Sequence, residues 1–240
     1  MQVLRLSALT SLLLASIGCS TLIPDDCPRP DGGTVDLVLQ QGLAGYGGTT
    51  DATIQRWNPG VNVGLHDNLQ VHLNAASSLT WHSRVVIRFE LSGAVPSPRP
   101  VASARLMLHD FRHNAFAGTK EALVAHELRV RPVEQQVTDV HAAAGRPWAA
   151  PLGKAGADYE QAIVASAPKP TPLPPGGTWI GLDLTASVRR WIATPAANHG
   201  WMIRGRSDDK GTKVSNDVHF NSAQHTDSVH RPKLVLRLAP

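Results

Sequence analysis

The sequence predicts an all-β fold, a jelly-roll-like antiparallel β-sandwich with one short helix. Apolar and polar side chains alternate with a period of two in several short segments rich in β-branched residues. Glycine, proline, asparagine and aspartate separate these segments, and a single stretch has helical spacing. Because such alternation leaves one face of each strand in solvent, it favours antiparallel sheets over a parallel sheet covered by helices.

The first residues are typical of a cleaved export signal. Arg5 supplies an early positive charge, and the apolar run 9–17 is too short to span a bilayer. Gly18 directly before Cys19 resembles the lipobox of bacterial lipoprotein signal peptides, although Ser16 stands where leucine is preferred. We therefore expect a signal peptide over residues 1–18 and lipidation of Cys19, with plain secretion as the alternative.

The mature chain is expected to be one domain on a tether. Residues 19–34 form the lipidated tether, since 20–34 contain three prolines and two glycines. Residues 35–240 suit one large all-β domain. With two cysteines in the whole chain, no disulfide framework is expected. We expect an exported protein of the cell envelope or extracellular space, bound to a membrane through its lipid.

The charge of the chain argues against one class of partner. Loss of residues 1–18 removes one of the 23 basic residues and leaves 22 against 19 acidic ones, a formal charge of +3. This mild excess does not indicate a nucleic-acid partner, and it is compatible with an acidic glycan.

Six segments show the strand pattern most clearly. In residues 84–89 the odd positions are apolar, whereas the even positions are Arg84, Val86 and Arg88. The same alternation recurs around residues 104–109 and 233–238, so one face of each strand is expected in the core and the other in solvent. The predicted strands are 84–91, 102–111, 126–133, 178–184, 200–205 and 232–238.

Residues 183–192 interrupt the strand pattern and predict a helix across one end of the sandwich. Asp183 or Thr185 is the candidate N-terminal cap. The proline-rich stretch 168–177 is expected to be a loop inside the domain. The apolar face of the helix comprises Leu184, Val188, Trp191 and Ile192.

Several motifs, taken in order, resemble the DNRLRE domain, a family also classed among carbohydrate-binding modules and related to a repeat of a polysaccharide disaggregatase. The resemblance covers about residues 35–240. The sequence departs from the family pattern at 134–140 (EQQVTDV) and at Gln224, where family members often have glutamate. The matching segments are 51–54 (DATI), 84–92 (RVVIRFELS), 103–108 (SARLML), 145–148 (GRPW), 183–191 (DLTASVRRW), 198–205 (NHGWMIRG) and 220–236 (FNSAQHTDSVHRPKLVL).

The resemblance implies a non-catalytic module that binds polysaccharide, with uronic-acid polymers among the plausible ligands. Arginine suits a sugar carboxylate because its planar fork donates hydrogen bonds in pairs. The alternative to ligand binding is that the arginines at positions 84, 88 and 204 are ordinary outward-facing strand residues. The predicted ligand-binding residues, expected to line a groove on a sheet face, are Arg84, Arg88, Arg204, His109 and Trp148.

Five of the six tryptophans divide into two groups. Trp191 and Trp201 are expected to anchor the core. For Trp57, Trp81 and Trp148 the sequence leaves open whether they stack on sugar or pack inside.

No metal or other cofactor is expected. The eleven histidines are scattered along the chain, for example His219, His225 and His230. A structural calcium at Asp208, Asp209 and Asp217 is the alternative to a solvated loop.

Two other functions stay open. One is a structural or adhesive envelope protein. The other is a polysaccharide-degrading enzyme, which would need two carboxylates converging in a cleft, with Asp110, Glu127 and Asp183 as candidates. The sequence shows no Gly-x-Ser-x-Gly, His-Glu-x-x-His, Walker or paired-cysteine zinc motif.

Overall fold

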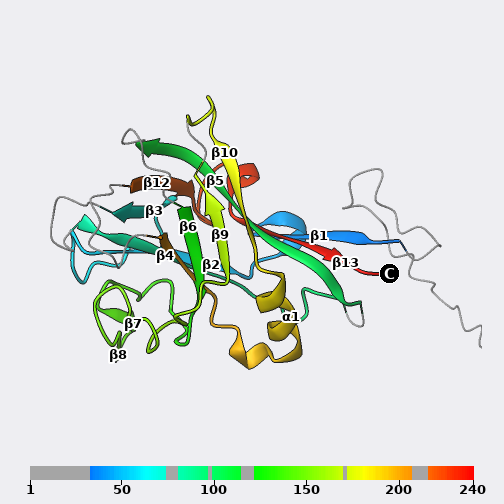
Figure 1. Ribbon diagram of the computed structural model, residues 1–240, viewed down its shortest axis with the longest axis horizontal. Coiled ribbons are helices and arrows are strands. Elements are labelled where there is room, and N and C mark those ends of the chain that lie inside the picture. Colours follow the sequence, from blue (N-terminus) through cyan, green and yellow to red (C-terminus); the bar gives the residue numbers. More distant parts are fainter. Residues whose placement is uncertain (1–32, 74–80, 97–98, 115–121, 170–171, 207–215) are drawn as a thin grey trace, which may run out of the picture.

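The computed structural model describes residues 33–73, 81–96, 99–114, 122–169, 172–206 and 216–240 (Figure 1). The predicted signal peptide (1–18) and lipidation site Cys19 lie outside these residues, as does the tether up to residue 32. Asp208 and Asp209 also lie outside them.

The strands form one large antiparallel sheet of eleven strands. Its order is β1-β13-β5-β12-β3-β4-β11-β6-β9, with β10 pairing β5 and β2 pairing β4. A separate hairpin consists of β7 (His141–Ala143) and β8 (Arg146–Pro147). The strands of the large sheet are β1 (Val35–Gln40), β2 (Thr49–Gln55), β3 (Asn68–Leu73), β4 (Ser83–Phe89), β5 (Val101–Asn114), β6 (Ala122–Glu127), β9 (Ala165–Pro168), β10 (Thr178–Asp183), β11 (Trp201–Gly205), β12 (Asn216–Asn221) and β13 (Lys233–Leu238).

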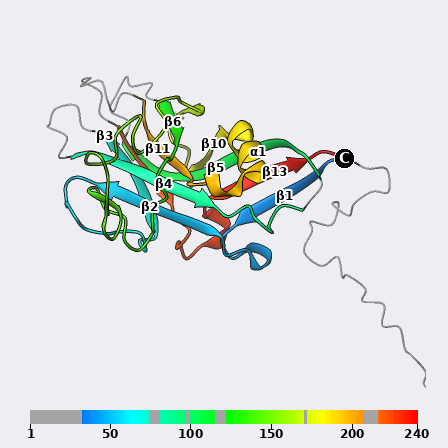
Figure 2. The same cartoon turned by 90° about the horizontal axis from the view of Figure 1, so that it is seen from below.

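The sheet curls into two layers, which are linked along the long strand β5 and at the junction of β3 with β4. The 14-residue β5 pairs with β13 along its first half and with β12 along its second half, where the register shifts. Strand β3 joins β4 through the pair His72 and Ser83. Figure 2 shows β1 beside β13 toward one end of the molecule and β2 beside β4 toward the other. The predicted all-β sandwich is confirmed, with both layers belonging to one curled sheet.

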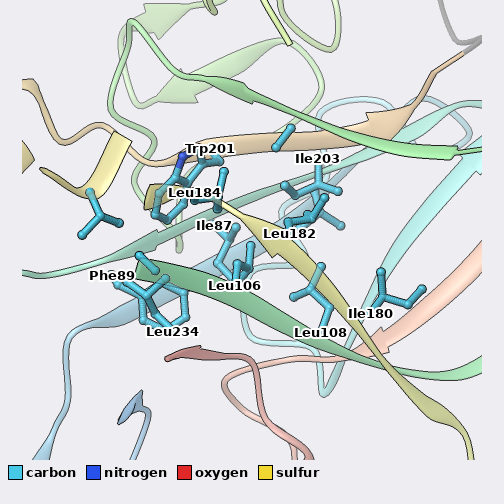
Figure 3. Close-up of a cluster of buried hydrophobic side chains, with 14 of the residues drawn as sticks. Ile87, Phe89, Leu106, Leu108, Ile180, Leu182, Leu184, Trp201, Ile203 and Leu234 are labelled. Carbon is cyan, nitrogen blue, oxygen red and sulfur yellow. The ribbon is translucent and has the colours of Figure 1, made fainter. Parts of the chain in front are cut away.

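The main core lies between the inner faces of the two layers (Figure 3). Ile87 and Phe89 of β4 face Leu106 of β5 and Leu234 of β13, and all four are at most 1% exposed. The alternation that predicted these three strands therefore assigned their core faces correctly. Burial of each such side chain contributes roughly 1.5–3 kcal/mol relative to exposure.

The opposite face of β2, β4 and β11 is also covered. Residues 128–164 run from β6 to β9 without long regular strands, and we call them the cover segment. They pack over that face and form a second apolar cluster, so all seven residues of β4 are buried. The expectation that one face of β4 is solvated is wrong for this reason. The cluster includes Ala52, Ile54, Val86, Leu128, Trp148, Leu152, Tyr159 and Met202.

One predicted strand has the wrong bounds. Residues 126–133 were expected to be extended, but β6 covers Ala122–Glu127 and ends there. The alternation continues past the strand because Leu128 and Val130 pack in the second cluster rather than in the main core. The six predicted segments also omit β1, β2, β3, β9 and β12.

The helix α1 (Thr185–Ala193) confirms the predicted helix at the end of the sandwich. The N-cap residue of α1 is Leu184, and no side chain caps the helix as Asp183 or Thr185 was predicted to do. Asp183 precedes the cap, and its carboxylate accepts hydrogen bonds from the Thr185 backbone N–H (3.0 Å) and hydroxyl (2.6 Å). Trp191 packs against Trp201 with 4.5 Å between ring centroids, and both are core residues as predicted. Ile192 is 38% exposed, because it lies about 100° around the helix from Trp191.

Across the described ranges, no helix is both long and apolar enough to cross a membrane. The proline-rich stretch 168–177 links β9 to β10, which lie against each other in the same domain.

A matched pair of substitutions tests the core. We expect Ile87→Ala to lower the free energy of unfolding by about 2–5 kcal/mol, because it leaves a cavity between the layers. Ile192→Ala should cost under about 1 kcal/mol, because its side chain is partly exposed. Urea unfolding monitored by tryptophan fluorescence measures both. Equal losses for the two variants would contradict the assignment of Ile87 to the core.

Candidate functional site

The three predicted arginines are all buried, and two of them, Arg84 and Arg204, are neighbours. The register of β4 and β11 places Ile203 opposite Val85, so the next pair along the strands is Arg204 and Arg84. Arg84, Arg88 and Arg204 are 6%, 7% and 5% exposed. The expected adjacency holds for Arg84 and Arg204 but not for Arg88, and the open basic groove is not present, because the cover segment lies over this face.

Arg84 binds the cover segment directly. Its Nη1 donates to the backbone oxygens of Leu152 (3.0 Å) and Gly153 (3.2 Å) and to the Tyr159 hydroxyl (3.3 Å). Its guanidinium also lies 5.6 Å from the centroid of the Tyr159 ring. Backbone carbonyls satisfy this buried cation, so Arg84 supports the fold rather than an open ligand surface.

Arg88 and Arg204 are also engaged inside the protein. Arg88 donates from Nε to the Asn198 backbone oxygen (3.0 Å), and its Nη2 pairs with Glu90 at 2.5 Å. Arg204 Nη1 donates to the backbone oxygen of Gly205 (3.0 Å), and its Nε lies 3.2 Å from His126 Nε2.

The other two predicted ligand residues are buried as well. Trp148 is 5% exposed and donates from Nε1 to the Thr138 backbone oxygen (2.9 Å) within the second cluster, so it packs rather than stacks on sugar. His109 is 5% exposed, and its Nδ1 lies 2.8 Å from Asn221 Oδ1. Trp57 is half-buried against His72, whereas Trp81 is 51% exposed.

Asp217, one of the calcium candidates, is occupied by side-chain donors. Its Oδ1 lies 2.8 Å from Gln70 Nε2, 3.1 Å from His219 Nε2 and 3.3 Å from His72 Nδ1. Burial opposes ionisation, but these hydrogen bonds prevail and hold the pKa of Asp217 well below its usual range. Within the described part of the chain, no group of three or more His, Cys, Asp or Glu side chains is arranged to hold a metal ion.

The proposed catalytic acids are not gathered together. Asp110 is fully buried and lies 2.6 Å from His113, and Asp183 accepts hydrogen bonds from Thr185 at the start of α1. Glu127 lines the cleft described next.

A cleft of about 520 Å³ opens where α1 crosses the ends of β6 and β11, and we call it the Arg190 cleft. Its volume is within the range of small-molecule sites. Three segments distant in sequence build it: the end of β6 with the cover segment, α1, and the loop before β11. Its lining consists of Glu127, Leu128, Arg129, Glu160, Arg190, Trp191, Ala197 and His199.

Two arginine–glutamate pairs hold the charged groups of the Arg190 cleft in fixed positions. Arg129 is bidentate to Glu160, at 2.8 Å and 3.2 Å, and also donates to the backbone oxygen of Gly156. Arg190 pairs with Glu127, which accepts a further hydrogen bond from the Ser187 hydroxyl (2.5 Å). The arginine side chains are 46% and 52% exposed, so each guanidinium is partly open to the cleft. Such pairs add little stability, but they restrict the rotamers of both arginines.

His199 adds a neutral polar group to the same cleft. Its Nδ1 is buried and has no hydrogen-bond partner among the described residues. Burial lowers the pKa of His199, and Arg131, Arg88 and Arg146 lower it further. The imidazole is therefore neutral at pH 7, with one nitrogen donating and the other accepting.

Gly200 fixes the backbone next to His199. It adopts the left-handed region at φ 89°, and a Cβ there would lie 2.5 Å from the Ile87 backbone oxygen. A side chain at position 200 would therefore push the loop away from β4 and move His199.

A smaller pocket lies behind His199, lined in part by Asp51 and Glu134. Its volume of about 10 Å³ approaches the space of one water molecule. Asp51 Oδ2 accepts from the Ala223 backbone N–H (2.8 Å), while its buried Oδ1 has no hydrogen-bond partner in the described ranges. Glu134 accepts from the Asp51 backbone N–H (2.8 Å) and from Gln224 Nε2 (3.1 Å). Gln224 thus supplies a donor where a glutamate would add a third carboxylate.

The sequence missed most residues of the Arg190 cleft. His199 lies in the motif 198–201 and could have been found there. Arg129 falls in the segment wrongly predicted as strand, and Arg190 and Glu160 carry no local signal because their proximity depends on the path of the cover segment.

Comparison with known proteins gives no assignment, since no protein-family model and no curated protein matches the chain. The resemblance to the DNRLRE domain therefore stays a prediction.

The buried Asp51 should make stability depend on pH. Burial raises the pKa of Asp51 to about 8, and the neighbouring Glu134 adds to the effect. Because the folded protein keeps a proton that the unfolded chain releases near pH 4, stability should fall as pH rises from about 4 to 8, by at most about 1.4 kcal/mol per pH unit for this proton. Urea unfolding at pH 5, 6, 7 and 8 measures the slope, which should be smaller in Asp51→Asn. An unchanged slope in that variant would show that Asp51 ionises freely.

Proposed function

We propose that this protein is a non-catalytic polysaccharide-binding module of the cell surface and that the Arg190 cleft holds sugar residues. One observation carries the proposal. Two partly exposed guanidinium groups and a neutral histidine, all in fixed positions, line one cleft of suitable volume.

The polar groups of the Arg190 cleft match the chemistry of sugar hydroxyls. A hydroxyl both donates and accepts, so neighbouring hydroxyls need donors and acceptors side by side. The Arg129–Glu160 pair offers this combination through its remaining N–H groups and its carboxylate oxygens, and the partly exposed Arg190 adds further donors. The neutral His199 can add one ring nitrogen, Nε2, because its Nδ1 is buried.

The cleft is also preorganised. Arg129 is bound to Glu160 and Gly156, and Glu127 is bound to Ser187 and Arg190. A ligand that binds such groups does not have to order them, which lowers the entropic cost of association.

The N-terminal sequence and the resemblance to the DNRLRE domain support the same proposal. A lipid on Cys19 would hold the module at a membrane, and polysaccharide would be its partner outside the cell. No cofactor takes part in this binding.

A glycan array followed by affinity measurements tests the proposal. We expect the protein to bind at least one polymer and His199→Ala and Arg129→Ala each to weaken that binding about tenfold, the effect of losing one good hydrogen bond to a ligand. Arg190 is a poorer choice, because its removal leaves the buried Glu127 without its cation.

Arg206→Ala is the matched control. Arg206 is exposed and follows β11 at the end remote from the cleft, where it donates to Ser166. The Arg206→Ala variant should bind the polymer with the same affinity as the wild type. If the protein binds none of the polymers on the array, the proposal is contradicted and a structural or adhesive role is favoured.

A second candidate function, polysaccharide cleavage, is favoured by Glu127 and Glu160, which both line the Arg190 cleft. Glycosidases act through two carboxylates. Under the binding proposal, bound polymer keeps its length during prolonged incubation. Release of reducing ends that disappears in Glu160→Gln would establish the enzyme instead.

A further inference from the structure

A second polar surface lies on the outer face of the layer formed by β13, β5 and β10. In Figure 1 β10 runs along β5, and the register pairs Gly181 with Met107, which in turn pairs with Lys233 of β13. In each strand the residues next to Gly181, Met107 and Lys233 enter the main core, so these three residues point outward. We call this surface the Trp179 face, and its residues are Arg105, Met107, Trp179, Gly181 and Lys233.

The Trp179 face is accessible. Arg105 is exposed, and Met107, Trp179 and Lys233 are half-buried. It differs in this respect from the face of β4 and β11, which the cover segment encloses.

Trp179 is held in position by its neighbours. Its ring lies 5.2 Å from the His109 ring in an edge arrangement and 6.3 Å from the His230 ring at an interplanar angle of 30°. The rings of His109 and His230 are themselves 4.0 Å apart. A fixed aromatic side chain that is partly exposed offers the apolar surface on which a sugar ring packs.

Lys233 places a cation over this aromatic ring. Its Nζ lies 4.1 Å from the centroid of Trp179. Among the described residues Lys233 makes no ion pair, and burial lowers its pKa. A partly desolvated cation without a counter-ion gains from the arrival of a carboxylate.

Arg105 provides a second cation on the same surface. A Cβ at Gly181 would lie 3.0 Å from one guanidinium nitrogen of Arg105, so the glycine lets this group lie close along the sheet. Arg105, like Lys233, makes no ion pair in the part of the chain that is described.

Two acids near the Trp179 face are engaged elsewhere: Asp36 is bidentate to Arg237, and Asp227 pairs with His230. Asp183 lies opposite Arg105 in the register of β10 and β5 and attracts it electrostatically, although its carboxylate accepts hydrogen bonds from Thr185. Within the described ranges neither Lys233 nor Arg105 makes an ion pair, in contrast to the Arg190 cleft, where both arginines are paired.

We infer that the Trp179 face is a second sugar-binding site, selective for acidic polysaccharide, in which a sugar ring packs on Trp179 and its carboxylate pairs with Lys233 and Arg105. The inference rests on the proposed function in that the ligand is a polysaccharide. It adds a separate site and a charge selectivity that the Arg190 cleft does not supply.

Polygalacturonate and its methyl ester are the probes, since they share a backbone and differ in charge. We expect the full chain to bind the acid form at least about tenfold more tightly than the ester, the effect of a charge-assisted hydrogen bond. Alginate serves as a second uronate polymer. The preference should decrease as salt concentration rises.

Lys233→Met is the decisive variant, because it keeps an apolar stem over Trp179 and removes the charge. It should bind the acid polymers about tenfold more weakly and leave ester binding unchanged. Arg105→Gln should act in the same direction, and Trp179→Ala should weaken binding of both forms. Arg206→Gln removes an exposed charge that belongs to neither site and is the control for a lost surface charge. Thermal unfolding reports whether each variant is folded.

Three results overturn the inference: no binding of either uronate polymer, equal affinity for acid and ester, or unchanged affinity in folded Lys233→Met. The Arg190 cleft is judged separately. If His199→Ala weakens polymer binding and Lys233→Met does not, the Arg190 cleft is supported as a binding site and the Trp179 face is not. If Lys233→Met weakens binding and His199→Ala does not, the Trp179 face is supported and the cleft is not.

Discussion

The hydrogen bonds from Arg84 to the backbone of residues 152–153 hold the cover segment on the sheet, and the candidate site depends on that attachment. The cover segment contributes Arg129 and Glu160 to the Arg190 cleft and Glu134 to the pocket behind His199. A guanidinium buried between strand and loop is costly unless its donors are satisfied, and here carbonyl oxygens satisfy them. Arg84, which the sequence predicted to bind a ligand, therefore helps to position the residues that line the candidate site.

The two polar surfaces handle positive charge in opposite ways. In the Arg190 cleft each arginine is neutralised by a glutamate, so the surface offers fixed donors and acceptors with little net charge. On the Trp179 face Lys233 and Arg105 make no ion pair with any described residue, so the surface offers charge next to an aromatic ring. Under the proposals above, geometry would dominate recognition at the first surface and electrostatics at the second.

The sequence predicted the strands better than their surroundings. Alternation identified the core faces of β4, β5 and β13, and helical spacing identified α1. Alternation cannot say what covers the second face, because Arg84 and Arg88 have the same pattern whether they face water or a loop that accepts their hydrogen bonds. Residues 128–164 have no sustained period, so their path over the sheet was not predictable, and with it the site residues Arg129 and Glu160.

The register between the first and last strands has a topological consequence. Val35 of β1 lies opposite Leu238 of β13, one interstrand spacing away, about 5 Å. The two ends of the folded region therefore meet, and a short peptide could join them while the chain is opened at another surface loop. Such a circularly permuted protein would keep every strand pairing, both clusters and both polar surfaces, and would place its new termini at the chosen loop.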